Sequence, residues 1–204
     1  MLSPNAITTL AKVKAQLGIS DSSKDAIIET YINGVTSFIE GFCGGRRFKS
    51  TVYAKEIDGN GTNIIALPQY PVTALASIQY RSGSWSSPTW NTYIVDGYIP
   101  DFDAGLIQFF ANTPKLPRYF KINYTAGYLI DFANETNETL HTLPFDLTNT
   151  ATNLVCALMN KRGSEGISTA STEGQSITFS DMKGVLSGMD GEVLSRYTKI
   201  TVAL

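Results

Sequence analysis

The 204-residue chain has no long apolar run and very little cysteine or histidine. Its apolar stretches, such as residues 106–111, are much shorter than the roughly 18 residues that a membrane-spanning helix requires. The two cysteines, Cys43 and Cys156, are too few for a disulfide framework and lie among apolar residues, so we expect buried thiols. The N-terminus lacks the basic and apolar regions of a secretory signal. We therefore expect the protein to fold in a reducing cytoplasm, outside any membrane.

The chain also lacks an excess of charge of either sign. It has 16 basic and 18 acidic residues, a net charge of −2, so the broad positive field of a dedicated nucleic-acid-binding protein is missing. Charged residues make up 17% of the chain, below the usual value of about 25%, whereas serine, threonine and asparagine are abundant. This composition suits β-rich surfaces and polar subunit interfaces, and it favours a protein that assembles with others.

Catalytic and metal-binding patterns are missing too. His141 stands in a polar segment without a second histidine or a cysteine at metal-ligand spacing, so we expect it at the surface. Asp101 and Asp103 could hold a cation, but their Pro-Asp-x-Asp-Ala-Gly context favours an Asx turn. Residues 58–61 favour a hairpin turn over a calcium loop. With no phosphate-binding loop or nucleophile motif, we expect no enzyme activity, no metal and no cofactor.

Helical periodicity is strong near both ends of the chain. The longest apolar stripe lies in a helix that Ser22 or Ser23 caps and that ends at residues 43–45, and we expect it to be the central core helix. The other expected helices cover residues 8–17, with Thr8 or Thr9 as N-cap and Gly18 as the stop, residues from 143 onward, and residues 189–197.

Between these helices the pattern is typical of strands and turns. Residues 51–57 and 63–67 flank the glycine-rich residues 58–61, which predicts a hairpin. Further strands are expected at residues 74–81, 91–95, 106–110 and 119–124, separated by prolines. The predicted fold class is α+β: a small helical bundle core, residues 1–47 and 129–204, with an inserted antiparallel β module, residues 48–128.

Three segments lack a clear place in either part. Residues 131–142 read as a loop, and the glycine-, serine- and threonine-rich residues 163–174 as a flexible arm that leads to an extended piece at 177–179. Residues 200–204 alternate like a strand without a later partner. This terminal strand could add to the sheet of another protein, or it could pair with the chain's own sheet or with residues 177–179.

Two pairs of surface candidates have more than one interpretation. Arg46 and Arg47 follow the long helix and could contact phosphate, or complement the dipole of that helix and pack against it. Trp85 and Trp90 flank a predicted hairpin turn and could stack on sugars, anchor a protein partner, or cap the end of the sheet's own core.

Short motifs follow one another in a distinctive order along nearly the whole chain. They are Lys14-Ala-Gln-Leu-Gly-Ile19, the helix ending Ser37-Phe-Ile-Glu-Gly-Phe-Cys-Gly-Gly-Arg-Arg-Phe48, Asp58-Gly-Asn-Gly61, Leu67-Pro68 with Pro71-Val72, Tyr124-Thr-Ala-Gly-Tyr128, Leu143-Pro-Phe-Asp-Leu147 and Leu194-Ser-Arg-Tyr197. In order and spacing, this series resembles the head-tail connector, or adaptor, family of tailed bacteriophages. The elaborated hairpin at residues 85–90 and the loop at 131–142 depart from the family pattern, which leaves the tail-side partner open.

The resemblance implies a structural protein of the phage neck, present in the virion and, during assembly, in the host cytoplasm. A ring of twelve copies would dock under the portal protein, extend the channel for double-stranded DNA without sequence-specific binding, and carry the stopper or tail-completion protein. We expect Trp85 and Trp90 to contact the neck or tail partner. The alternative is a carbohydrate- or receptor-binding β module that uses the same two tryptophans. The residues expected to bind the portal are Arg196, Tyr197, Lys199, Ile200, Val202 and Leu204.

Overall fold

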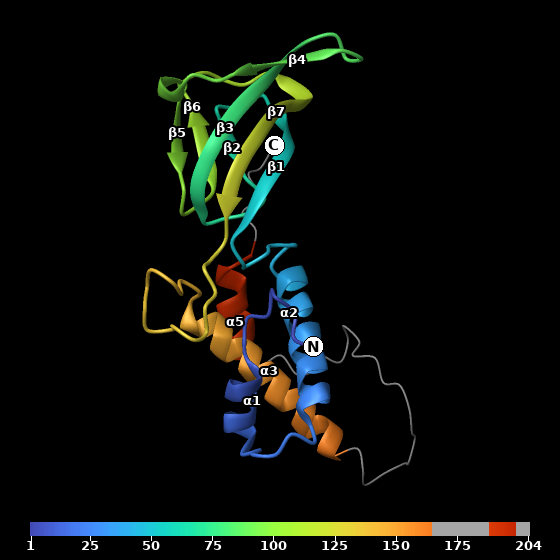
Figure 1. The fold of residues 1–204 in the computed structure, drawn as a ribbon. Coiled ribbons are helices and arrows are strands. Elements are labelled where there is room, and N and C mark those ends of the chain that lie inside the picture. The colour runs from blue at the N-terminus through green and yellow to red at the C-terminus, as the bar shows by residue number, and fades with distance from the viewer. Residues whose placement is uncertain (165–187, 199–204) are drawn as a thin grey trace. The chain divides into compact units, whose positions relative to one another are not determined.

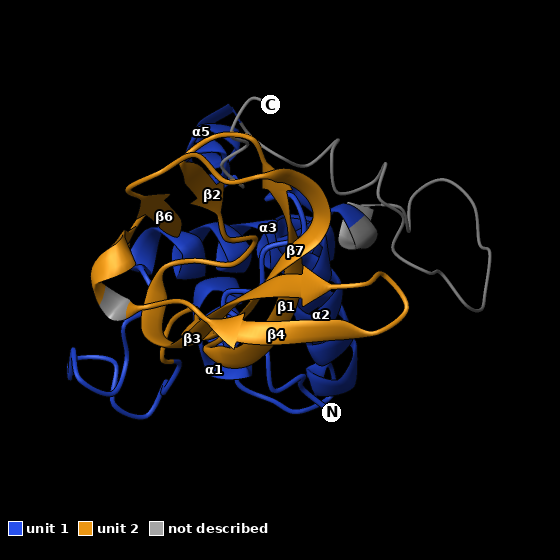
Figure 2. Ribbon diagram, turned by 90° about the horizontal axis from the view of Figure 1, so that it is seen from above, with its two compact units in different colours: residues 1–48, 130–198 blue, residues 49–129, 199–204 orange. Residues whose placement is uncertain are grey.

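The computed structural model describes residues 1–164 and 188–198, and these fall into two compact units (Figures 1 and 2). The first unit comprises residues 1–48 and 130–198, and the second includes residues 49–129. The predicted domain limits lie one residue from these divisions. That the units are a connector core and an inserted module stays a prediction. No helix among the described residues has the length and apolar character needed to cross a membrane.

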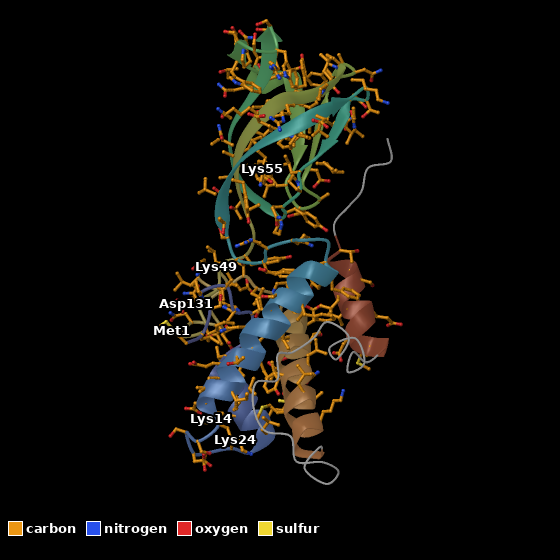
Figure 3. The ribbon with its side chains drawn as sticks, turned by 90° about the vertical axis from the view of Figure 1, so that its right-hand side faces the viewer. Met1, Lys14, Lys24, Lys49, Lys55 and Asp131 are labelled. Atoms are coloured by element: carbon orange, nitrogen blue, oxygen red, sulfur yellow. The ribbon has the colours of Figure 1, made fainter. Side chains whose placement is uncertain are left out.

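The first unit is helical. Helix α1 (Leu10–Leu17) begins after Thr9, whose hydroxyl accepts a hydrogen bond from the Lys12 N–H, and ends at Gly18 in the left-handed conformation (φ 67°). Of the two candidate caps, Thr9 is therefore the one used. Lys14 of α1, labelled in Figure 3, pairs with Asp25 at the start of α2 (Asp25–Phe42), with 2.7 Å between Nζ and Oδ1. This ion pair joins the first two helices.

The predicted cap of α2 is wrong. Neither Ser22 nor Ser23 caps the helix, which begins at Asp25 without a side-chain cap. Instead, the backbone N–H and the hydroxyl of Ser23 both donate to the carboxylate of Asp21. The serine is thus engaged in an Asx-type turn that precedes the helix, because Asp21 competes for the same local hydrogen bonds.

The central helix of the first unit is α3 (Phe145–Ser164), and the prediction that gave this place to α2 is wrong. Helix α3 contacts α1, α2 and also α5 (Gly188–Arg196). Its predicted apolar stripe, Leu147, Ala151, Leu154, Val155 and Leu158, is buried. Threonines on its other sides, such as Thr148 and Thr152, are buried as well. Helix α3 is therefore covered on nearly every side.

The second unit is built from two antiparallel sheets (Figure 1). The first sheet has the strand order β1-β7-β3-β4 and the second the order β2-β6-β5. Residues 95–97 form a short 3-10 helix, so the strand expected at 91–95 ends earlier, and β5 was not expected. The bounds are β1 Thr51–Asn60, β2 Ile64–Ala66, β3 Val72–Gly83, β4 Pro88–Thr92, β5 Tyr98–Asp101, β6 Leu106–Phe109 and β7 Lys115–Ala126.

The predicted hairpin between residues 51–57 and 63–67 is wrong. Strand β1 pairs with β7, and β2 pairs with β6 in the other sheet. The chain crosses between sheets after Asn60, whose side chain donates to the Ile64 carbonyl and accepts from the Thr62 N–H. These hydrogen bonds close a turn after which the chain continues into the second sheet and does not pair with β1.

Side chains from both sheets form a buried apolar core in the second unit, with aromatic rings at its centre. The rings of Phe109 and Phe120 stack with centroids 4.9 Å apart, and Ile65, Ile78 and Ile122 are buried around them. The α+β class is thus confirmed. The placement of the core in a small helical bundle is not confirmed, because this separate apolar core belongs to the sheets.

Gly59 lies where β1 passes close to the backbone of the β6–β7 connection. A Cβ built on Gly59 would stand 2.1 Å from the carbonyl oxygen of Pro114. We therefore expect Gly59→Ala to lower the free energy of unfolding by about 1–3 kcal/mol, since a rigid backbone atom must move. Chemical denaturation measures the change. Gly41→Ala, where nothing stands within 4 Å of the added Cβ, is the control, and equal stability of both variants would contradict the close approach.

Candidate functional site

The side chains considered above as catalytic or metal-binding candidates make structural contacts instead. The Asp101 carboxylate accepts a hydrogen bond from the Ala104 N–H at 3.0 Å, so it caps the turn as predicted, although the bond spans three residues and not the two of an Asx turn. In residues 1–164 and 188–198, no group of three His, Cys, Asp or Glu residues is placed to hold a metal ion. Cys43 and Cys156 are buried free thiols, as predicted. Burial raises the pKa of the Cys43 thiol to about 11, so it stays protonated at neutral pH.

The expectation of a surface position for His141 is wrong, because only 5% of this residue is exposed. Its Nδ1 accepts a hydrogen bond from the Asp131 N–H at 3.0 Å, and its ring lies 5.3 Å from that of Phe132. His141 thus closes the loop of residues 131–142 on itself. Its role in this loop is structural.

The two tryptophans lie on the hairpin formed by β3 and β4, as predicted. Trp85, in the turn, is 64% exposed, and the Arg81 guanidinium stacks over its ring at 4.0 Å from the centroid. Arg81 also donates a hydrogen bond to the Trp85 carbonyl oxygen at 2.5 Å. Trp90 is half-buried, with the Lys121 ammonium 5.7 Å from its ring. The exposure of Trp85 argues against a role in capping the sheet's own core.

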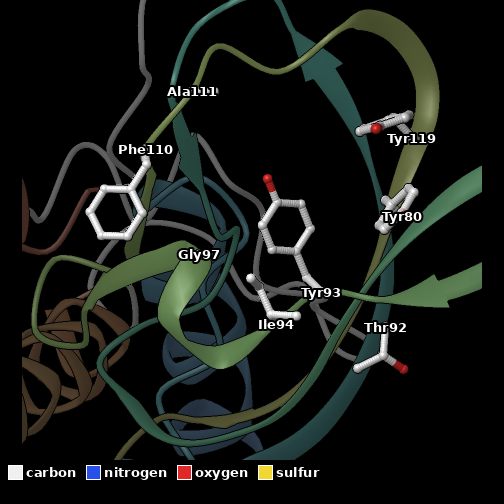
Figure 4. Close-up of a pocket in the computed structure, with 8 residues that line it drawn as sticks. All are labelled: Tyr80, Thr92, Tyr93, Ile94, Gly97, Phe110, Ala111 and Tyr119. Carbon is white, nitrogen blue, oxygen red and sulfur yellow. The ribbon is translucent and has the colours of Figure 1, made fainter.

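A hollow of about 450 Å³ opens at the base of the same hairpin. Phe110 and Tyr119 lie on opposite sides of it, with the Tyr93 ring between them (Figure 4). Phe110 and Ile94 are mostly exposed, at 71% and 73%. Burial, and then the neighbouring Tyr93 and Tyr80, raise the pKa of the Tyr119 phenol. The residues that line the hollow include no acidic or basic side chain, so it is uncharged. Sequence reasoning missed this site, because its aromatic residues come from separate strands and loops.

The C-terminal helix is held by a second group of residues. Arg46, only 1% exposed, donates from Nη1 to the Tyr197 carbonyl oxygen at 2.7 Å. The Tyr197 hydroxyl donates to Asp146 Oδ1 at 2.8 Å, and its ring meets that of Phe48 edge-on, with centroids 6.2 Å apart. The burial of Arg46 excludes the phosphate-contact interpretation and supports packing. Through this hydrogen bond the Arg46 guanidinium lies at the C-terminal end of α5 as well as near the C-terminal end of α2, so it can complement the dipoles of both helices.

The residues expected to bind the portal are Tyr197, which Arg46, Phe48 and Asp146 hold in place, and residues close to it in the sequence. Arg196 is exposed and Tyr197 is anchored. Lys199, Ile200, Val202 and Leu204 lie outside the described residues, as does the expected strand at 177–179. Helix α3 extends to Ser164, two residues into the predicted arm at 163–174, and the remainder of that arm is also outside them.

Tyr197→Phe isolates the contribution of one hydrogen bond in the anchor. The ring can still pack on Phe48, but the bond to the Asp146 carboxylate is lost. We expect a loss of about 1–2 kcal/mol in the free energy of unfolding. The measurement is a double-mutant cycle with Asp146→Ala, in which the two losses should not add. Fully additive losses would contradict a direct interaction.

Comparison with known proteins decides the family. The head completion protein family matches residues 6–198, which is nearly the entire chain. The chain belongs to this family. Among solved structures, the neck of an empty GTA particle computed with C6 symmetry contains a similar chain, with 17% sequence identity and a TM-score of 0.53. The match covers 100% of this chain and 95% of that one, and it shows a shared fold. No curated protein matches the chain.

Membership in the head completion protein family confirms the resemblance to head-tail connector proteins. It also confirms the expected role as a structural protein of the phage neck. The order of short motifs therefore predicted the family, although single residues did not. The rival interpretation, a carbohydrate- or receptor-binding module, loses its basis, since the family match includes the helices that such a module would not need.

Proposed function

We propose that this head completion protein forms a ring of twelve copies under the portal protein at one capsid vertex. The family match over residues 6–198 carries the proposal, because it spans residues of both compact units. The symmetry named for the similar neck supports it, since a ring of twelve also has a sixfold axis. In this proposal, residues 1–47 and 129–204 are the connector core, and residues 48–128 are an inserted module.

The ring extends the channel for double-stranded DNA and offers a platform to the stopper or tail-completion protein. The DNA passes without sequence-specific binding. The net charge of −2 supports this, because a strongly basic channel would grip DNA that must slide through it. The protein works without catalysis, metal or cofactor, first in the host cytoplasm and then in the virion.

The C-terminal residues dock on the portal in this proposal. Arg46, Phe48 and Asp146 hold Tyr197, so the part of the chain just before the C-terminal residues is anchored in the first unit. Residues 200–204 alternate the larger apolar side chains of Ile200, Val202 and Leu204 with the smaller ones of residues 201 and 203, which suits addition of a strand to the edge of a partner's sheet. Arg196 and Lys199 bring positive charge beside this strand, and we propose that they face an acidic rim of the portal. The tryptophan hairpin contacts a neighbour in the neck.

Deletion of residues 199–204 tests this docking. Because the anchor at Tyr197 stays intact, we expect the midpoint of thermal unfolding to change by less than about 2 °C. Attachment to portal-bearing heads, measured by co-sedimentation, should be lost. The full-length chain should co-sediment, and a scrambled order of the last five residues should behave like the deletion. Normal attachment of the truncated chain would contradict docking through this segment.

A further inference from the structure

Trp85 lies in the turn of the hairpin whose base lines the aromatic hollow. Tyr80 of β3 and Thr92 of β4 line the hollow, whereas Trp85 is not among its lining residues. The Trp85 indole stacks instead on Arg81, whose guanidinium lies 4.0 Å from the ring centroid. Each copy of the chain therefore carries both an exposed indole and a hollow that its own indole does not fill.

We propose that Trp85 of one copy inserts into the aromatic hollow of the next copy around the ring. The proposal rests on the ring assembly proposed above and names the partner of the hairpin. A projecting group that fits a different region of the next copy makes a head-to-tail interface, which is the type that closes rings. The hairpin tip extends away from the sheets of its own unit, where a neighbour can reach it (Figures 1 and 2).

Contacts with Arg81 hold the Trp85 side chain in place at the tip of the hairpin. Arg81 stacks on the indole and donates to the Trp85 carbonyl, so the side chain is held before it binds. A side chain that is already ordered loses less conformational entropy on association. With 64% of the residue exposed, most of the indole surface remains available for burial. Tryptophan set in a pocket is a frequent source of binding energy at protein interfaces.

The hollow fits an indole in size and chemistry. Its volume of about 450 Å³ has room for one aromatic ring system. Phe110 and Ile94 supply apolar contacts that are exposed in the single chain, and they would be covered by the inserted ring. The hydroxyls of Tyr93 and Tyr119 offer acceptors for the indole N–H, which seeks a partner when buried. Tryptophan, apolar with one donor, matches this uncharged site better than a charged side chain.

Paired cysteines test the contact in the full-length chain. Ser86, beside Trp85, and Ala111, in the hollow, are both exposed. We expect the double variant Ser86→Cys/Ala111→Cys, assembled on purified portal and mildly oxidised, to form a ladder of multimers up to the full ring. Each single variant should give no species beyond a dimer. The native thiols are buried and should not contribute. Assembled rings without a ladder would overturn the proposal.

Substitutions separate this inference from the proposed function. Trp85→Ala and Phe110→Ser should raise the concentration for half-maximal ring assembly on the portal at least about thirtyfold. Ile99→Ser, an exposed apolar position outside the hollow, should leave it unchanged. If Trp85→Ala rings assemble normally, the inference is wrong, whether or not a tail protein still attaches. If the unaltered chain forms no ring on the portal, the proposed function itself fails.

Discussion

Phe120→Ala should lower the free energy of unfolding by about 3–5 kcal/mol, the usual cost of removing a buried aromatic ring. Phe120 is fully buried in the second unit. Its ring stacks on Phe109 at 4.9 Å and meets Tyr119 edge-on at 4.8 Å, so its removal leaves a cavity and breaks two ring contacts. For a chain of this size, the midpoint of thermal unfolding should fall by roughly 6–20 °C.

Phe110→Ala is the matched control for this change. Phe110 belongs to the same unit but is 71% exposed, so its truncation should cost less than about 0.5 kcal/mol. Thermal and denaturant unfolding of the two variants and the unaltered chain measure the difference. Similar stability of the two variants would contradict the stacked core of the second unit.

Arg46→Ala should destabilise the first unit by about 3–4 kcal/mol, through a lost hydrogen bond from a charged donor and a void where the side chain packed. The guanidinium donates to the Tyr197 carbonyl and lies 5.5 Å from the Phe48 ring centroid. Without it, the end of α5 loses its cationic partner. We expect hydrogen exchange to accelerate first in residues 188–196, before the amides of α3 are affected.

Arg47→Ala provides the control, because Arg47 is the next residue and its side chain is exposed. Arg47 interacts electrostatically with the Glu40 carboxylate near the protein surface, so its removal should lower the free energy of unfolding by no more than about 1 kcal/mol. If Arg46→Ala is as mild as Arg47→Ala, or if exchange in α5 stays slow, Arg46 does not anchor the C-terminal helix.

Elements with a strong local signal were predictable from the sequence. The apolar stripe of α2 and the Thr9 and Gly18 signals of α1 identify their helices, because caps and periodicity act within a few residues. The central place of α3 was not predictable, since threonines occupy several of its buried positions. Thr152 illustrates the reason: its hydroxyl donates to the Thr148 carbonyl and bonds the Thr8 hydroxyl, which satisfies a polar group inside the unit.

Pairing between distant segments was the other limit. A glycine-rich turn after β1 suggests a hairpin with the following strand, but β1 pairs with β7, whose residues lie about sixty positions away. Turn composition carries no information on such a partner. The aromatic hollow was missed for the same reason, because Tyr80, Tyr93 and Tyr119 meet only after the strands pair. The exposed hairpin with Trp85 was predictable, since both of its strands and its turn are local.

The central claim is that the protein is a ring-forming component of the phage neck that docks on the portal. Electron microscopy of the purified full-length protein mixed with its portal tests it most directly. The account predicts a ring of twelve copies stacked coaxially on the portal, with an open channel through both. Portal particles without added density, or copies bound without closing into a ring, would contradict it.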